Sequence, residues 1–343
     1  MFEARKICIL LAAYNGEKYL FEQIRSIQEQ TVSNWSLLIR DDGSQDHTRQ
    51  ILEKFAADPR IRMLDDNLGR LGATRNFGAL MDSARSEGAE TIFFCDQDDV
   101  WLPDKMFRQL QSLQDLEGRH GTEMPLLTYS DMEVVDENLR RIHRSFMMYQ
   151  RQRHEPKNPI YVLLAQNFVA GCTIAINRQL LEFAVPIPEE ITLHDWWLAV
   201  CAAACGRIGY IDQPLVRYRQ HGTNQVGAVT TPKVFNFLAA TYRKRLSKPQ
   251  YFVLRPIRQA AALSERLKML KVDCSFDVRR VVDAFASSGE GGVLRRFWTV
   301  YRLPLRRQGF FRNLLWLARL VCSGTPRKAK TAFAANRSVR ASK

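Results

Sequence analysis

The 343-residue sequence lacks three features, each of which would have assigned it to a class of protein. No stretch reaches about 18 uninterrupted apolar residues, so we expect no transmembrane helix; the nearest run, residues 160–176, is broken by Gln166 and Asn167. The N-terminus shows no apolar segment with a small-residue cleavage site, so no signal peptide is expected. The seven cysteines form no disulfide framework, and we expect buried, reduced thiols in a cytoplasmic chain.

Acidic residues are scarce in the last third of the chain. Residues 233–343 contain 25 Lys and Arg but only 5 Asp and Glu, a net charge of +20, whereas residues 1–232 carry a net charge of −6. Hydrophobic residues make up 46% of the chain, which is normal for a folded core and excludes wholesale disorder. This asymmetry predicts a folded N-terminal domain with a basic, surface-binding segment appended to it.

The first hundred residues alternate between apolar runs and stretches of helical periodicity. The pattern predicts strands at 7–13, 36–39, 61–64 and 91–95, and helices at 17–30, 48–57 and 72–84. Such alternation is typical of a parallel sheet with helices on both faces. Ligands of these sheets bind at the carboxyl ends of the strands.

Polar clusters follow three of the predicted strands. Tyr14 and Asn15 follow the first strand, Asp41 and Asp42 the second, and the run Asp96-Gln97-Asp98-Asp99 the fourth. Their shared position predicts that all three lie on one rim of the sheet. Three carboxylates within four residues suit a hard cation, Mg²⁺ or Mn²⁺, that is shared with a substrate phosphate. An ordinary acidic turn is the alternative interpretation of this run.

The second half of the domain is less regular. We expect strands at 126–129, 169–176, 208–211 and 214–219, and helices at 105–116, 178–184 and 198–204. Residues 140–159 are polar and basic and are expected to form a mobile loop, and residues 220–227 a flexible one. The run His194-Asp195-Trp196-Trp197 leads into the apolar helix at 198–204.

These motifs together resemble family 2 glycosyltransferases, which are inverting enzymes with the GT-A fold, and the resemblance covers about residues 5–227. The matching elements, in chain order, are Ala13-Tyr14-Asn15, Asp41-Asp42-Gly43-Ser44, Asn67-Leu68-Gly69 with Arg75-Asn76, the Asp96–Asp99 run and His194-Asp195-Trp196-Trp197. The sequences of residues 95–105, 194–199 and 218–227 look most like those of a rhamnosyltransferase-like branch of this family. The resemblance implies an α/β GT-A fold with a Rossmann-like mixed sheet and a C-terminal helical extension.

The resemblance also implies roles at the donor site. Asp98 corresponds to the last carboxylate of the family's DxD motif and is assigned to the metal, with Asp96 on the ribose or on the water around the metal. Asp42 resembles the family's base-binding carboxylate, although a turn aspartate bonding local amides is the alternative, one that suits Asp41 better. The other nucleotide-binding candidates are Ala13, Tyr14, Asn15 and, facing the diphosphate, Arg75. We expect Arg70 to be solvated.

Asp195 is the candidate catalytic base, because inversion needs a carboxylate that deprotonates the attacking acceptor hydroxyl. Its position at a helix N-terminus favours the ionised form, whereas Trp196 and Trp197 could exclude water and raise its basicity. The tryptophans could also form a platform for a sugar or a lipid chain. The alternative is a capping aspartate and two core tryptophans. The role of His194 is open, since many relatives carry Glu there, and His221 is either a further metal ligand, a pyrophosphate contact or a structural residue.

The basic C-terminal segment has amphipathic helical periodicity at 235–246, 256–270, 293–303 and 309–321. Aromatic and aliphatic residues opposite arginines are typical of helices that lie in a membrane interface. We therefore divide the chain into a catalytic domain at 1–227, a membrane-associating helical region at 228–324 and a disordered basic tail at 325–343. Packing of these helices on the catalytic domain is the alternative, and nucleic acid is not expected as a partner because no nucleic-acid motif accompanies the charge.

The sequence thus predicts a metal-dependent inverting glycosyltransferase of bacterial cell-surface polysaccharide synthesis, peripheral at the inner face of the cytoplasmic membrane and in contact with its anionic surface. The expected donor is a nucleotide sugar, best dTDP-rhamnose, and the acceptor a glycan or a polyprenyl-diphosphate-linked glycan. The alternatives are a metal-dependent phosphatase or nucleotidyltransferase, or a non-catalytic glycan- or lipid-binding scaffold. The first strand carries neither a nucleophilic aspartate nor a Gly-rich basic loop, and retention of Asp42, Asp98 and Asp195 argues against a scaffold.

Overall fold

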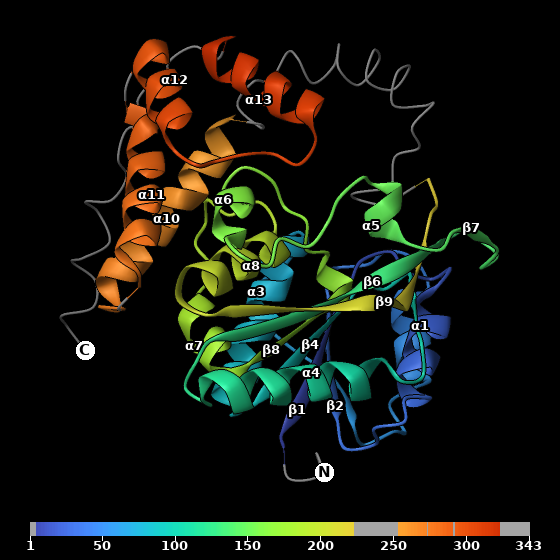
Figure 1. The fold of residues 1–343 in the computed structure, drawn as a ribbon. Coiled ribbons are helices and arrows are strands. Elements are labelled where there is room, and N and C mark those ends of the chain that lie inside the picture. The colour runs from blue at the N-terminus through green and yellow to red at the C-terminus, as the bar shows by residue number, and fades with distance from the viewer. Residues whose placement is uncertain (1–4, 223–252, 273, 291, 323–343) are drawn as a thin grey trace.

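The computed structural model describes residues 5–222, 253–272, 274–290 and 292–322, and a mixed β-sheet forms its centre (Figure 1). Within these residues the sheet has nine strands in the order β3-β2-β1-β4-β8-β6-β9-β5, with β7 paired to β6. They are β1 (Ile7–Ala13), β2 (Ser36–Asp41), β3 (Ile61–Met63), β4 (Thr91–Cys95), β5 (Val100–Trp101), β6 (Leu126–Val135), β7 (Arg141–His143), β8 (Ile174–Asn177) and β9 (Arg207–Arg219). β1 to β4 run parallel, whereas β8 is antiparallel to both of its neighbours. The mixed sheet implied by the family resemblance is confirmed.

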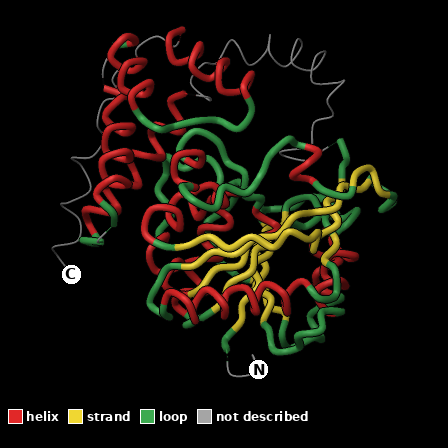
Figure 2. The backbone as a smooth tube through the Cα atoms, in the orientation of Figure 1, coloured by secondary structure: helices red, strands yellow, loops and turns green. Residues whose placement is uncertain are grey.

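Helices cover both faces of this sheet (Figure 2). Those of the N-terminal domain are α1 (Leu20–Gln28), α2 (Thr48–Glu53), α3 (Ala73–Ser86), α4 (Lys105–His120), α5 (Phe146–Tyr149), α6 (Pro159–Leu163), α7 (Arg178–Ala184) and α8 (His194–Cys205). Side chains alternate between the two faces of a strand. In β1, Cys8 and Leu10 join the core beneath α3, α7 and α8, whereas Ile9 and Leu11 join the core beneath α1 and α4. The continuous apolar run of β1 therefore reflects burial on both faces.

The C-terminal helices pack on the α7–α8 side of the molecule (Figure 1). They are α10 (Arg255–Met269), α11 (Phe276–Ser287), α12 (Val293–Arg302) and α13 (Phe310–Cys322). Their buried faces, which include Leu263, Phe285 and Trp316, belong to the same hydrophobic core as Trp197 of α8. The guanidinium of Arg266 donates hydrogen bonds to backbone carbonyls at the end of α7. The inner faces of these helices are therefore packed on the catalytic domain, as the alternative to membrane association proposed.

Residues 140–159 contain β7, α5 and the start of α6, so the expected mobile loop is wrong. The buried carboxylate of Asp131 on β6 accepts hydrogen bonds from the hydroxyl of Ser145 and the backbone N–H of Met147. Ser145 in turn caps α5 by accepting a hydrogen bond from Met148 N. A buried carboxylate thereby orders a segment whose sequence is mostly polar.

Three other elements differ from the sequence prediction. β9 is a single strand across Pro214, where its pairing with β6 shifts register. The expected strand at 169–176 begins with a 3₁₀ turn at Gly171–Thr173. Helix α11 was not predicted, and Ser275 caps it by accepting a hydrogen bond from Val278 N. The helix expected at 235–246 and most of the loop at 220–227 lie outside the described residues.

None of the helices in the described ranges combines the length and the apolar character that a membrane span needs. Cys8, Cys95, Cys172, Cys201, Cys205 and Cys274 are free thiols, as expected, and the first four of them are buried.

Candidate active site

The turns that follow β1 and β4 are joined by the side chain of Gln97. Its Oε1 accepts a hydrogen bond from Tyr14 N at 2.8 Å, and its Nε2 donates to Tyr14 O at 3.0 Å. A Cβ atom added to Gly16 would lie 2.6 Å from Gln97 Oε1, so this position has no room for a side chain. Sequence reasoning missed Gln97. Its position as the one amide among carboxylates was a signal that its side chain forms hydrogen bonds with a backbone peptide.

The turns after β1 and β2 are joined in a similar way. Asn15 N donates to Ser44 Oγ at 2.9 Å, and Asn15 Oδ1 accepts from Gln45 N at 2.9 Å. Asn15 has a left-handed backbone with φ of 48°, a conformation that asparagine adopts more readily than most residues. The structure therefore brings together the three polar clusters at the carboxyl edge of the sheet, as the sequence pattern predicts.

Asp42 is almost fully buried and organises the loop that precedes α3. Its Oδ1 accepts from Arg40 Nη1 at 2.9 Å and from Leu71 N at 2.7 Å, and its Oδ2 accepts from Gly72 N at 2.7 Å. Asp41 accepts from Ser44 N within the turn, as expected of a turn aspartate. The contact of Asp42 with the uracil or thymine ring of a donor stays a prediction. The structure adds a second role for Asp42, which is to hold the loop before α3.

Two arginines that the sequence analysis singled out are exposed. Arg70 is exposed, as expected, and its guanidinium stacks over the ring of Tyr14, with 4.1 Å between its Cζ and the ring centroid. Arg75 is exposed and lies 4.0 Å from the carboxylate of Glu189. Its contact with a diphosphate stays a prediction.

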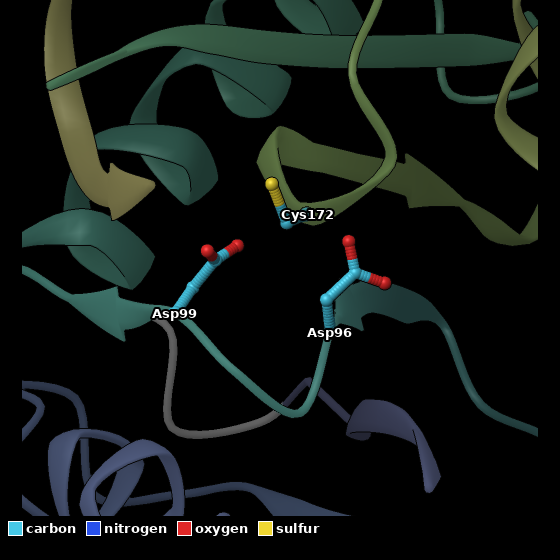
Figure 3. A group of neighbouring side chains, drawn as sticks. All are labelled: Asp96, Asp99 and Cys172. Atoms are coloured by element: carbon cyan, nitrogen blue, oxygen red, sulfur yellow. The ribbon is translucent and has the colours of Figure 1, made fainter. Parts of the chain in front are cut away.

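Residues 96–99, here called the acidic corner, follow β4 directly. Asp98 Oδ2 lies 2.8 Å from His221 Nε2, and Asp99 Oδ1 accepts from Arg219 N at 3.1 Å. Figure 3 shows the side chains of Asp96 and Asp99 on either side of Cys172, and their ligand atoms lie within 4.8 Å of one another.

Two carboxylates of the acidic corner have raised pKa values. Burial raises the pKa of Asp96 to about 7, and the charges of Asp98 and Asp195 add to this rise. Burial and the same crowding raise the pKa of Asp99 well above its usual value, and its Oδ2 has no hydrogen-bond partner within the described residues. A site of this kind stabilises a bound cation, because the cation favours the ionised form of each carboxylate.

The donor set fits a hard divalent cation. Carboxylate oxygens suit Mg²⁺ and Mn²⁺, and both Asp96 and Asp98 are partly exposed. Burial raises the pKa of the Cys172 thiol well above its usual value, and its Sγ lies 3.3 Å from Met132 Sδ. A protonated thiol is a poor ligand, so Asp96 and Asp99 are the members of this group that could hold a metal. The metal contact of Asp98, which lies beside the imidazole of His221, stays a prediction.

Asp195 lies in the first turn of α8, as the sequence predicted. Its Oδ1 accepts from Trp196 N at 2.5 Å. Burial raises the pKa of Asp195 to about 7, whereas hydrogen bonds from the backbone of Gly171 and the side chain of Asn167 act in the opposite direction. The charge of Asp195 contributes to the raised pKa of Asp96, so the two carboxylates lie close enough to interact.

The neighbours of Asp195 have structural roles. His194 stacks between Phe77 and Phe94, with ring centroids 3.9 and 5.6 Å away, and burial lowers its pKa to about 3, so its imidazole is neutral. Trp197 is fully buried and donates to Ala184 O at 2.9 Å, so the predicted acceptor contact is wrong for Trp197. Trp196 is partly exposed, and its acceptor contact stays a prediction.

A pocket of about 210 Å³ opens between the turn after β1 and the acidic corner. Its lining includes Lys18, which the sequence did not single out, together with Asn15, Asp98 and His221. Arg219 supports the acidic corner from within: it is 1% exposed, and its Nε donates to Asp98 O at 3.0 Å. Sequence reasoning missed Arg219, because its role depends on where β9 ends.

A sheet with these turns at its carboxyl edge, facing a carboxylate at the head of a helix, defines a glycosyltransferase of the GT-A fold. The chain belongs to glycosyl transferase family 2, whose sequence profile matches residues 8–181. It is 31% identical over 229 residues to the dTDP-rhamnosyl transferase RfbG of Shigella flexneri, covering 64% of this chain and 74% of that one.

Two further comparisons agree with this assignment. The chain is 28% identical over 192 residues to the UDP-Glc:alpha-D-GlcNAc-diphosphoundecaprenol beta-1,3-glucosyltransferase WfgD of Escherichia coli, covering 55% of this chain and 68% of that one. The crystal structure of S. aureus TarS superposes with a TM-score of 0.51 at 16% identity, covering 85% of this chain and 72% of that one. The last comparison concerns the fold alone.

Proposed function

We propose that this enzyme transfers a sugar from a nucleoside-diphosphate donor to a hydroxyl group of a glycan or lipid-linked acceptor, with inversion, in bacterial cell-surface polysaccharide synthesis. The observation that carries this proposal is the proximity of Asp96 and Asp195, which come from β4 and α8 and lie close enough for their charges to interact. One carboxylate belongs to the proposed donor site and the other is the proposed base.

The donor is held by the turns at the carboxyl edge of the sheet. Asn15 and Tyr14 line the nucleotide side, and the pocket beside them is large enough for a diphosphate but not for a whole nucleotide sugar. A Mg²⁺ or Mn²⁺ ion held by Asp96 and Asp98 would neutralise the charge that develops on the departing diphosphate. Lys18 also lines this pocket, where its ammonium group pairs with the carboxylate of Glu137.

Asp195 removes the proton of the acceptor hydroxyl as that oxygen attacks the anomeric carbon from the face opposite the diphosphate. Its raised pKa, about 7, makes it a better proton acceptor than an exposed aspartate and still leaves it substantially ionised near neutral pH. The hydrogen bond from the backbone N–H of Trp196 to Asp195 Oδ1, at 2.5 Å, orients the carboxylate.

The similarity to RfbG supports dTDP-rhamnose as the donor, and the similarity to WfgD supports an acceptor built on a polyprenyl diphosphate. An acceptor of this kind lies at the inner face of the cytoplasmic membrane, where the basic C-terminal helices would contact anionic lipid. The exposed side chains of Leu294, Trp298, Phe310 and Phe311 on α12 and α13 support that location.

A thermal-shift screen of nucleotide sugars with Mn²⁺ tests the donor site. We expect dTDP-rhamnose to raise the Tm of the wild type, and the shift to disappear in Asp98→Ala or in the presence of EDTA. If no nucleotide sugar stabilises the wild-type protein in the presence of metal, the proposed function is wrong. Slow metal-dependent hydrolysis of the stabilising donor would further exclude a non-catalytic scaffold.

A further inference from the structure

A second pocket, here called the basic pocket, lies between residues 151–155 and the segment that connects α12 to α13. Its volume is about 330 Å³. Its lining contains four arginines and one carboxylate; the lining residues are Arg151, Gln152, Arg153, Glu155, Arg306, Arg307, Gln308 and Gly309. Arginine concentrated in this way is typical of sites for phosphate groups, because the guanidinium fork matches their oxygens.

The walls of the basic pocket are joined by hydrogen bonds of Gln308 that do not use the side chains of Arg151 and Arg153. Arg153 N donates to Gln308 Oε1 at 3.0 Å, and Gln308 Nε2 donates back to Arg153 O at 2.6 Å. Gln308 N also donates to Gln166 Oε1 at 3.1 Å. The side chain of Gln308 is almost fully buried, so the two walls are held together by a buried amide. The side chains of Arg151 and Arg153 remain exposed.

The charge of the basic pocket is only partly balanced. Glu155, the one acidic residue of its lining, pairs with Arg306 at 2.8 Å. Behind the wall, Arg312 donates to the carbonyl of Gln150, and burial and the charge of Arg151 both lower its pKa. Crowded arginines with a single carboxylate favour a bound anion of more than one charge.

One wall of the basic pocket contacts the segment that influences the candidate base. Gln152 Nε2 donates to Asn167 O at 3.2 Å, and the side chain of Asn167 acts to lower the pKa of Asp195. A group bound in the basic pocket is therefore separated from Asp195 by the segment around Asn167. On the other side, Gly309 leads directly into Phe310 and Phe311, both 76% exposed.

We propose that the basic pocket binds the diphosphate of a lipid-linked acceptor, which places its sugar toward Asp195 and its hydrocarbon chain along the exposed face of α13. This inference rests on the proposed function and adds the residues that recognise the acceptor. Arg151 and Arg153 supply the positive charge, and Arg306 is shared between the ligand and Glu155.

The test is a binding titration of the full chain with inorganic pyrophosphate and with farnesyl diphosphate, in EDTA so that no metal bridges a diphosphate to the acidic corner. The double variant Arg151→Gln/Arg153→Gln should weaken both ligands by about tenfold or more, since charge-assisted hydrogen bonds are lost. The double variant Arg258→Gln/Arg295→Gln removes the same charge from exposed sites on α10 and α12 and should bind as the wild type does.

A third variant predicts a change of opposite sign. Glu155→Gln removes the carboxylate from the basic pocket and frees Arg306, so both diphosphates should bind more tightly, a result that loss of folding does not produce. Equal binding by the wild type and the Arg151→Gln/Arg153→Gln variant would overturn the proposal. So would an equal loss in the Arg258→Gln/Arg295→Gln control, which would indicate attraction to net charge alone.

Two further measurements separate the remaining explanations. Phosphatidylglycerol vesicles should not displace farnesyl diphosphate at equal phosphate concentration; displacement would identify a phospholipid headgroup site instead and overturn the proposal. Thermal stabilisation by a nucleotide sugar with Mn²⁺ should be unchanged in the Arg151→Gln/Arg153→Gln variant. If that stabilisation is absent from the wild type, the proposed function is wrong. If it is present but the Arg151→Gln/Arg153→Gln variant binds diphosphates as tightly as the wild type, only the present inference is wrong.

Discussion

At the scale of single residues, their partners distinguish the carboxylates of the candidate site. Asp41 closes a turn, Asp42 holds the loop before α3, and burial raises the pKa values of Asp96 and Asp195. Sequence position alone indicated that these residues mattered, because each follows a strand or begins a helix. It could not indicate their partners, since those come from segments far away in the chain.

Asp195→Asn should abolish most of the transferase activity without loss of donor binding. An amide cannot accept the proton of the acceptor, and general bases contribute about 10²- to 10⁴-fold to rate. Because the base must be ionised and its pKa is about 7, kcat/KM of the wild type should rise with pH up to about 7 and level off above it. The exposed Asp115→Asn on α4 is the control and should keep the wild-type profile. A profile in Asp195→Asn that matches the wild type would contradict the assignment.

The Asp195→Asn variant should be more stable than the wild type above pH 7 in EDTA. The pKa of Asp195 is raised from 3.8 to about 7 in the folded state, so between these values the folded protein retains a proton that the unfolded chain releases. Stability of the wild type therefore falls as pH rises through this window. Asn lacks this dependence, and the difference should grow to at most about 4 kcal/mol at pH 8. Denaturant unfolding at pH 5 and pH 8 measures it; an equal difference at both values would refute it.

Gln97→Ala should raise KM for the donor about tenfold, because two hydrogen bonds that fix the Tyr14 peptide are lost. Gln45→Ala, which removes an exposed side chain from the neighbouring turn, is the matched control. Steady-state kinetics with varied donor gives both values. A loss of Tm with an unchanged KM would show that Gln97 supports the fold but not the donor site.

At the scale of elements, periodicity predicted most of the central sheet and its helices. β1, β4 and α7 have the expected bounds, since each is a run of apolar residues or a regular amphipathic pattern. The segment at 140–159 was missed for a physical reason, because it is ordered by a cap and a buried carboxylate, interactions that hydrophobic periodicity does not contain. Helix α11 does have an apolar face, formed by Val281, Val282 and Phe285, and was overlooked in the sequence.

The exposed end of α13 gives a prediction at this scale. Phe310→Ser/Phe311→Ser should weaken binding to phosphatidylglycerol vesicles by about tenfold or more, because each aromatic side chain contributes roughly 1–2 kcal/mol when it enters an interface. Phe276→Ser on α11 removes an equally exposed aromatic residue and should have little effect. Co-sedimentation over a range of lipid concentrations gives the affinities. Equal binding by all three proteins would place the contact elsewhere.

At the scale of the whole molecule, the charge asymmetry predicted two regions but not how they meet. The catalytic domain and helices α10 to α13 share one hydrophobic core. The inner faces of these helices therefore pack on the catalytic domain. Charge counts could not reveal this, because the buried faces of these helices are apolar while their arginines raise the net charge. The arginines that are buried, such as Arg266, serve the contact itself.

Arg266→Ala should therefore destabilise the whole enzyme rather than the C-terminal helices alone. Arg266 donates to the carbonyls of Phe183, Val185 and Pro186, and its loss leaves these acceptors without their partner, which costs on the order of 3 kcal/mol. Arg258→Ala, an exposed arginine on the same helix, is the control. Unfolding should remain a single transition that coincides with loss of donor binding, because the core is continuous. Two separate transitions, with donor binding lost only in the second, would show that the helices fold apart from the catalytic domain.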